Sequence, residues 1–529
     1  MKFAVQKKKI LILAFLALSV IPLISLITSL GIIKEREKVW YAGDYDPSYA
    51  YLYNSLNIAT FRLVGHFDHP GTPMQITGSV ILWGTWLLST DHSNTLTEDV
   101  ISNPEYYLRS LNISTAILTA LILLLLSVLI WEKTRQFWIA FLFQLSPFIS
   151  GMILYNGFTR TSQESMLLMA SLMIAATCLL WFLIDENKGK KNLLMFGIIS
   201  GFGLASKIIF APLLIIPLII YKPLADKMKF IKYAILSFFI FTIPIIPLYP
   251  RMGWWFIKLF IHSGIYGTGS VTVIEPTSYL QALGNLIVSE PVYSVFYLIV
   301  FIGTAALLLS KWITGKPWNK ETILLAAILL TQTIGFLITA KHPKSSYLLP
   351  YEALSITAFI IILSFLFARI QSKISRGIAI TIVIIPLSIF LITYGLDSRN
   401  KLFSTDTNQG YEKAWMKTVS EADAVIGINP GPSPIAAAYF ANTYSWNHYG
   451  NLLSRLYPKY YIFDTYKSQL TTFDGKSVNI DVIKATHGNT IAIIGADVDQ
   501  LRYLVKSDVK FEVINYIPEK VEVGLLQFK

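Results

Sequence analysis

The chain has 529 residues, of which 54% are hydrophobic and 14% charged, and its net charge at neutral pH is +12. Soluble globular domains carry about 25% charged residues, so a water-soluble enzyme is excluded for most of the chain. The single cysteine, Cys178, excludes an intramolecular disulfide and a cysteine-rich metal site. From Leu396 onward 14 basic residues balance 14 acidic ones, so the positive excess belongs to the first 395 residues. The basic residues form short clusters between apolar runs, which is typical of cytoplasmic loops and predicts no nucleic-acid partner.

The N-terminus is basic and leads directly into a long apolar run. Lys2, Lys7, Lys8 and Lys9 precede an uninterrupted apolar stretch over residues 10–33. The apolar core of a signal peptide is about 7–15 residues long and ends in a small-residue cleavage site. This run is longer, so we predict a retained first transmembrane helix that enters from the cytoplasm.

Ten further apolar runs are close to the length that a bilayer core of about 30 Å requires of a helix. They are residues 109–131, 137–155, 165–184, 192–206, 208–221, 231–249, 292–310, 322–340, 347–368 and 377–395, which predicts eleven crossings in all. With the N-terminus inside, every basic cluster between the runs lies on one side, as the positive-inside rule requires. The clusters contain Lys133, Arg135, Lys188, Lys190, Lys191, Lys222, Lys227, Lys229, Lys232, Lys311, Lys316, Lys320, Arg369, Lys373 and Arg376.

Two segments are assigned by the same charge rule. Residues 192–221 are interrupted only by Lys207, and a hairpin with this lysine at its outer tip keeps the later clusters inside. Residues 74–90 follow Pro70 and Pro73, and we expect a helix that lies in or dips into the outer interface.

After Gly395 the composition changes, and the topology places the tail outside the cytoplasm. Short apolar runs predict strands over residues 424–428, 460–463, 490–494 and 511–517, with helices over 433–444 and 498–506. The predicted fold is therefore mainly α: a polytopic transmembrane bundle (1–395, with 34–73 as the first extracytoplasmic loop) and a small C-terminal extracytoplasmic α/β domain (396–529).

Ionisable residues are nearly absent from the spanning runs and collect on the predicted outer side. They are Asp44, Asp46, Arg62, Asp68, His69, Arg160, Glu164, Lys207, Lys341, His342 and Lys344. Chemistry on a lipid-linked phosphate needs a carboxylate that takes a proton from a hydroxyl and cations that hold the departing phosphate.

Each of these residues also has a structural interpretation. Asp46-Pro47 and His69-Pro70 are common turn dipeptides, and Lys207 is placed as a snorkelling lysine would be. Arg160 and Glu164 are four residues apart and suit a surface pair, while Trp254 and Trp255 suit an interfacial belt. The functional interpretation rests on the location of all these groups on one predicted face.

The order of these motifs resembles the GT-C superfamily of integral-membrane glycosyltransferases, in particular the protein O-mannosyltransferase and aminoarabinose-transferase branch. The matching segments, in chain order, are Asp44-Tyr-Asp46-Pro47, Asp68-His69-Pro70-Gly71, Arg160 to Leu167, Gly201-Phe-Gly-Leu-Ala-Ser-Lys207 and Ser346-Tyr347-Leu-Leu-Pro350. Two departures are that Asp46 is followed by Pro47, as in the Asp-Pro of oligosaccharyltransferases, and that Ser346 stands where the family has arginine.

The resemblance implies transfer of a sugar from a polyprenyl-phosphate donor to an acceptor hydroxyl, with inversion of the anomeric centre. The reaction would take place on the extracytoplasmic side of the plasma (inner) membrane. Asp46 or Asp44 would be the general base. Groups for donor phosphate and sugar would be Arg62, Asp68, His69, Arg160, Glu164, Lys207, Lys341, His342 and Tyr347. The acceptor is a glycan, a lipid or a protein, and a divalent metal such as Mg or Mn is an open alternative.

Other classes stay open at this point. An oligosaccharyltransferase-like en bloc transfer would differ in pocket volume. A transporter or flippase of lipid-linked sugars would place charges deep in several helices. A membrane anchor that presents the C-terminal domain would need no acidic loop.

Overall fold

The structure is a computed structural model, and it describes residues 2–36, 38–40, 45–90, 92–184, 189–261, 275–406, 411–431, 433–495, 509–515 and 522–528. The internal contacts divide the chain into two units. The helical unit contains Met1–Ile33, Phe67–Pro73 and Ile113–Phe403. The mixed unit contains Lys34–His66, Met74–Asn112 and Ser404–Lys529.

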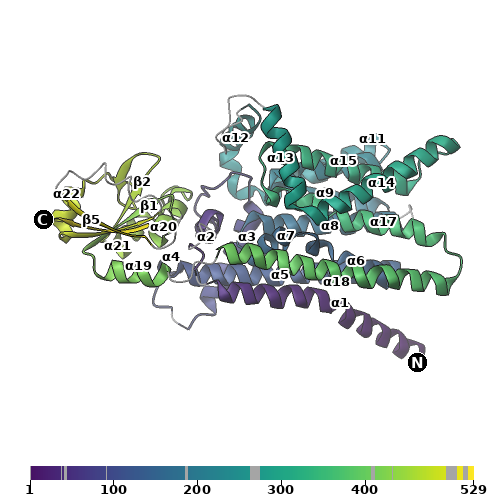
Figure 1. Ribbon diagram of the computed structural model, residues 1–529, viewed down its shortest axis with the longest axis horizontal. Coiled ribbons are helices and arrows are strands. Elements are labelled where there is room, and N and C mark those ends of the chain that lie inside the picture. The colour runs from purple at the N-terminus through teal and green to yellow at the C-terminus, as the bar shows by residue number, and fades with distance from the viewer. Residues whose placement is uncertain are drawn as a thin grey trace. The chain divides into compact units, whose positions relative to one another are not determined.

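The helical unit consists of apolar helices that run along one another, although one end of the first, the second and the last of them is counted in the mixed unit (Figure 1). In chain order they are α1 (Lys2–Glu35), α5 (Pro104–Thr134), α6 (Phe137–Phe143), η1 (Ser146–Ile149), α7 (Gly151–Thr159), α8 (Gln163–Leu183), α9 (Gly189–Ser206), η3 (Ile208–Leu214), α10 (Ile215–Ile220), α11 (Leu224–Phe241), η4 (Ile243–Leu248), α12 (Tyr249–Ile261), α13 (Pro276–Ser289), α14 (Pro291–Thr314), α15 (Lys320–Lys341), η5 (Ser345–Tyr347), α16 (Leu349–Glu352), α17 (Ser355–Ala368) and α18 (Lys373–Asp406). Among the described residues, seven helices are long and apolar enough to cross a membrane, and a bent pair makes up to eight. The predicted polytopic helical fold is therefore confirmed.

Seven of the predicted spans correspond to these seven helical segments, and the other four are bent, short or divided. Residues 231–249 belong to a pair of helical segments, Leu224–Phe241 and Ile243–Lys258, that are bent by 86° where α11 meets η4. Residues 192–206 and 208–220 form shorter apolar helices. Residues 137–155 are divided among α6, η1 and α7. Prolines explain three of the irregular segments, since Pro147, Pro212 and Pro247 lie in η1, η3 and η4 and cannot donate a helical hydrogen bond.

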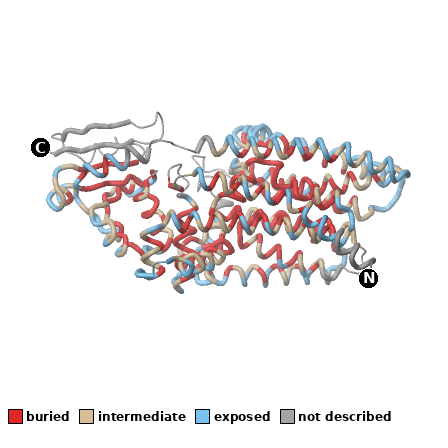
Figure 2. Tube along the Cα trace, turned by 90° about the horizontal axis from the view of Figure 1, so that it is seen from below, coloured by how far each residue is buried: buried red, intermediate tan, exposed pale blue. Residues whose placement is uncertain are grey.

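Burial follows the helix faces, with buried residues where helices meet and exposed ones on the outward faces (Figure 2). On α18 the exposed apolar side chains recur at helical spacing, at Ile378, Ile382, Ile385 and Ile389, whereas Leu391 is fully buried. An exposed apolar stripe of this kind is compatible with lipid and unfavourable in water.

Two glycines allow α9 and α11 to pack backbone to backbone. A Cβ added at Gly201 would lie 2.5 Å from the carbonyl oxygen of Ala234, and one at Gly197 would lie 2.4 Å from the Cβ of Tyr233. Small residues four apart permit such close approach of membrane helices. The Ser237 hydroxyl, which donates to the carbonyl of Ile198 at 2.7 Å, adds a polar link across the seam.

The mixed unit contains a six-stranded sheet with the strand order β3-β2-β1-β4-β6-β5. Its strands are β1 (Ala424–Asn429), β2 (Tyr460–Asp464), β3 (Gln469–Thr471), β4 (Thr490–Gly495), β5 (Val509–Asn515) and β6 (Glu522–Phe528). β1 pairs in parallel with β2 and β4, and the other pairs are antiparallel. The four predicted strands are confirmed, β3 and β6 were not predicted, and the helix predicted over 498–506 lies outside the described residues.

The helices of the mixed unit come from both ends of the chain. They are α2 (Tyr45–Ala59), most of α3 (Thr72–Leu87), α4 (Leu96–Ser102), α19 (Tyr411–Ser420), α20 (Pro434–Thr443), α21 (Gly450–Leu456) and α22 (Ile480–His487). The helix predicted over 433–444 is α20. The 16-residue α3 is not among the helices that meet the length and hydropathy criteria for a span.

The loop between the first two predicted spans packs against the C-terminal sheet region within this unit. Asn54 on α2 donates to the carbonyl of Tyr444 at 2.9 Å, and the indole N–H of Trp446 donates to the carbonyl of Val64 at 2.9 Å. Gly65 is required there, since a Cβ would lie 2.5 Å from the carbonyl oxygen of Tyr444.

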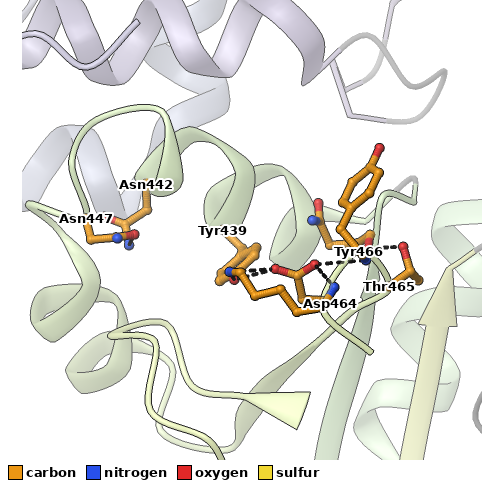
Figure 3. Close-up of polar contacts among 8 residues, drawn as sticks. Tyr439, Asn442, Asn447, Asp464, Thr465 and Tyr466 are labelled. Carbon is orange, nitrogen blue, oxygen red and sulfur yellow. Dashed lines mark hydrogen bonds and ion pairs between the residues drawn. The ribbon is translucent and has the colours of Figure 1, made fainter. Parts of the chain in front are cut away.

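Asp464, at the carboxyl end of β2, orders the turn that follows (Figure 3). It accepts hydrogen bonds from the Tyr439 hydroxyl at 2.9 Å and the backbone N–H of Tyr466 at 3.1 Å, and it lies 2.9 Å from the ammonium of Lys467. Burial opposes ionisation of this carboxyl, but the hydrogen bonds from Lys467 and Tyr439 outweigh it and lower its pKa. The contacts account for the turn without a ligand.

We expect the stability of the mixed unit to fall in acid through His66. Its ring lies edge-on to Tyr51 and Tyr444, at centroid distances of 5.1 and 5.4 Å, and burial lowers the pKa of His66 to about 4. In the unfolded chain histidine has a pKa of about 6.5, so the unfolded chain binds this proton at a higher pH than the folded chain does. Between these two pKa values the free energy of unfolding therefore decreases as the pH falls, by roughly 3 kcal/mol in total.

The measurement is the thermal unfolding midpoint in detergent from pH 7 to pH 4. His66→Phe should flatten the slope in this window, because phenylalanine retains a ring and cannot bind the proton. The same substitution at the exposed His92 is the control and should leave the slope unchanged. An unchanged slope in His66→Phe would contradict the assignment.

Candidate functional site

A buried ion pair joins two segments of the helical unit. The ammonium of Lys207 lies 2.6 Å from Oε1 of Glu164, and their side chains are 2% and 7% exposed. Glu164 lies in the first turn of α8, and Lys207 has left α9 in an extended conformation and precedes η3. The predicted break at Lys207 is confirmed, and Glu164 pairs with this distant lysine and not in the Arg160–Glu164 surface pair weighed above.

The glycines of the segment 201–207 explain how the lysine reaches this position. A Cβ at Gly203 would lie 2.6 Å from the ring of Phe210, so only glycine allows η3 to fold back against the end of α9. The backbone N–H of Lys207 still donates to the carbonyl of Gly203 at 2.9 Å, which closes the last helical turn.

Aromatic rings and an imidazole surround the pair. The Lys207 ammonium lies 4.4 Å from the centroid of the Tyr347 ring, a distance at which a cation is attracted to the π face. The imidazole of His69 lies edge-on to Trp255 at 4.8 Å and to Tyr347 at 6.4 Å. His69 has φ of 62°, a left-handed conformation that is uncommon for a non-glycine residue and turns the chain at this point.

The other predicted cations of the helical unit lie on neighbouring segments. Arg160 follows α7, donates to Asn156 at 3.4 Å and lies over the ring of Tyr155. Lys341 and His342 end α15, and Lys344 is exposed and acts electrostatically on Glu164. Burial, with a smaller effect of Lys341, lowers the pKa of His342.

The structure thus brings together Glu164, Lys207, Tyr347 and His69, which we define as the ion-pair site. Trp255, which the sequence suggested as interfacial belt, belongs to the same group by its contact with His69. Asp68 adjoins His69 in the chain and is partly buried.

The remaining predicted residues belong to the mixed unit. Asp46 is exposed and begins α2 with non-helical φ and ψ, while Asp44 lies outside the described residues. Arg62 follows α2, and its guanidinium lies 5.4 Å from the centroid of the Tyr449 ring.

A hydrogen-bonded cluster, not predicted from the sequence, fixes the end of α2 beside Arg62. The Tyr449 hydroxyl donates to Oδ1 of Asn57 at 2.7 Å, and Nδ1 of His448 lies 3.2 Å from the same oxygen. Burial, and secondarily the charge of Arg62, lowers the pKa of His448. No sequence signal links these positions, because His448 and Asn57 are 391 residues apart in the chain.

Two buried carboxylates in the helical unit also escaped the sequence analysis. Glu290 occupies the N-cap position of α14 and is hydrogen-bonded to Ser150 and Ser345, and burial raises its pKa. Glu352 is fully buried, acts electrostatically with Glu290, and has no hydrogen-bond partner for either carboxylate oxygen among the described residues. The sequence signal that could have identified Glu352 is its position inside the predicted span 347–368, because carboxylates are rare in membrane-spanning segments.

The described residues contain no group of three or more His, Cys, Asp or Glu side chains that could hold a metal ion. Asp44 of the first predicted outer loop is not among the described residues. The ion-pair site offers an ammonium paired with a carboxylate and placed beside an aromatic ring. Lysine has three N–H donors, and among the described residues the ammonium of Lys207 contacts the Glu164 carboxylate and the Tyr347 ring.

Removing one partner of the pair should be far more destabilising than removing both charges. Lys207→Met leaves a buried carboxylate uncompensated, which costs about 3–5 kcal/mol in such pairs. In Lys207→Met/Glu164→Gln no charge is left buried, so we expect most of that loss to be recovered. Thermal unfolding in detergent measures both variants, and a double variant as unstable as the single one would contradict the coupling.

Comparison with protein-family models and with curated proteins finds no match. Among solved structures, the chain is similar to ArnT from Cupriavidus metallidurans bound to undecaprenyl phosphate, with 11% identity and a TM-score of 0.42 over 90% of this chain and 97% of that one. It is also similar to the apo state of that protein, with 11% identity and a TM-score of 0.45 over 88% and 94%. The Archaeoglobus fulgidus oligosaccharyltransferase with Zn and sulfate is 11% identical, with a TM-score of 0.44 over 89% of this chain and 67% of that chain. No residue of this chain takes its role from these structures.

Proposed function

We propose that this chain is a multi-pass membrane glycosyltransferase that moves a sugar from a polyprenyl-phosphate donor to an acceptor hydroxyl. In this proposal the N-terminus is cytoplasmic and the reaction takes place on the extracytoplasmic side of the inner membrane. The observation that carries it is the buried Lys207 of the ion-pair site, which keeps a cation among aromatic rings at the predicted outer ends of apolar helices.

The donor half of the reaction needs a cation where negative charge develops. As the bond between the anomeric carbon and the phosphate oxygen breaks, the electron pair stays on polyprenyl phosphate. A preorganised donor in a water-poor site lowers such a barrier by about 3 kcal/mol. Lys207 is assigned this role, because Glu164 and Tyr347 hold its ammonium in place. Arg62, Arg160, Lys341 and Lys344 are further candidates for phosphate contact, and His69, His342 and Asp68 for the sugar.

The acceptor half needs a base. Asp46 is assigned as the group that takes the proton from the acceptor hydroxyl while its oxygen forms the new bond to the anomeric carbon, opposite the departing phosphate. This displacement inverts the anomeric centre. Asp46 is exposed, and an exposed carboxylate with a pKa near 3.9 is a weak base, so bound substrates must desolvate it.

Asp46→Asn tests the assignment of the base. General-base catalysis contributes about 100-fold or more, so glycan transfer should fall by at least this factor with unchanged protein levels. The measurement is the cell-envelope glycan profile by mass spectrometry in a deletion strain that carries each variant. Asp481→Asn, an exposed aspartate of the same unit, is the matched control and should restore transfer fully.

The same assay separates a structural from a functional role of Lys207. If the ion pair only stabilises the fold, Lys207→Met/Glu164→Gln regains transfer together with stability. The proposal requires that this double variant fold and remain inactive. Full transfer by both Asp46→Asn and the double variant would overturn the proposed function.

A further inference from the structure

A cavity of about 610 Å³ lies at the other end of the helical unit, where α8 ends and α15 begins. Its lining includes Trp181 at the end of α8, Tyr221 and Lys222 in the turn before α11, and Trp318 and Lys320 at the start of α15. α8 has 21 residues and Glu164 lies in its first turn, so this cavity and the ion-pair site are roughly 30 Å apart along one helix. The two sites are therefore separate.

Among the described residues that line the cavity, basic side chains outnumber acidic ones. Lys222 and Lys320 line it together with Asp226, but Asp226 already pairs with Lys229 at 3.3 Å. Lys320 is held in position, since its ammonium donates to the carbonyl of Ile184 at 2.9 Å and lies 4.8 Å from the ring of Trp181. Among the described residues, Lys222 has no carboxylate within salt-bridge distance. The described lining therefore offers ammonium groups to an anion.

Neutral groups of the cavity favour the same kind of ligand. Tyr221 is only 9% exposed, and its buried hydroxyl has no hydrogen-bond partner within the described part of the chain. The 18-residue α11 and the 22-residue α15 both begin here, so their positive N-terminal ends meet at the cavity. The cap of α11 is Pro223, whose side chain accepts no hydrogen bond, so its first N–H groups have no side-chain cap.

The setting distinguishes a lipid from a soluble anion. Trp181 and Trp318 flank the cationic groups, and tryptophan is enriched where apolar helices meet the polar headgroups. Both lysines belong to the clusters that the charge pattern assigns to the cytoplasmic face, where anionic lipids collect. We propose that this cavity binds the phosphate headgroup of an anionic phospholipid of the cytoplasmic leaflet. The proposal does not depend on the reaction assigned to the ion-pair site.

The test uses the full chain, purified and delipidated in detergent, with phosphatidylglycerol or phosphatidylcholine added back. Thermal stabilisation and native mass spectrometry both report binding. We expect phosphatidylglycerol to stabilise the chain and phosphatidylcholine to have no effect. Lys222→Gln should weaken the apparent affinity for phosphatidylglycerol at least fivefold, whereas Lys316→Gln, the same change at an exposed lysine outside the cavity, should not.

Tyr221→Phe is the second variant, because it retains the buried ring and removes only the hydroxyl. A loss of affinity of at least threefold in this variant supports the site even where Lys222→Gln is poorly folded. Equal binding of both lipids, or equal behaviour of the Lys222, Tyr221 and Lys316 variants, would overturn the proposal. Stabilisation by inorganic phosphate alone, to the same extent as by phosphatidylglycerol, would also overturn it, because it would indicate a free anion.

Discussion

The helical unit depends on the ion pair between Lys207 and Glu164. Two charges this well buried lose their hydration, and the mutual attraction must compensate for that loss within the fold. The pair can form only because α9 stops at Ser206 and because Gly201 and Gly203 let α11 and η3 come close to its end. Packing of small residues therefore determines where a charge can be held. The same ammonium lies over Tyr347, so the segments of α8, η3 and η5 meet around one cation.

In the mixed unit, residues at opposite ends of the sequence form one structure. Asn54 and Asn57 of α2 bind Tyr444 and Tyr449, which follow α20, and Trp446 binds Val64. The loop that carries Asp46 is therefore supported by the C-terminal region. If Asp46 is the base, as proposed, these contacts would help to hold it in position, since the position of a base depends on the rigidity of what supports it.

The polar groups of the helical unit lie near the ends of its helices and serve different purposes. Glu164 and Lys207 provide a fixed cation at one end of α8, while Lys222 and Lys320 provide a positive cavity at the other. Glu290 and Glu352 are buried carboxylates with no salt bridge among the described residues, and burial raises the pKa of Glu290. Buried ionisable side chains also occur within the described spans, where Glu164, Glu352 and Arg399 are 6%, 0% and 3% exposed.

Composition and periodicity determined the main class of this protein, because long apolar runs and alternating charge clusters are local properties of a chain. Seven spans, the break at Lys207, four strands and α20 were predicted for this reason. The proline-rich segments were predicted as spans and are broken, since hydropathy does not register a missing N–H donor. Only the tertiary structure decided that Lys207 pairs with Glu164, that His69 meets Trp255 and Tyr347, and that α2 joins α20. These contacts depend on packing between segments far apart in sequence, and no local pattern records which distant partner a side chain will have.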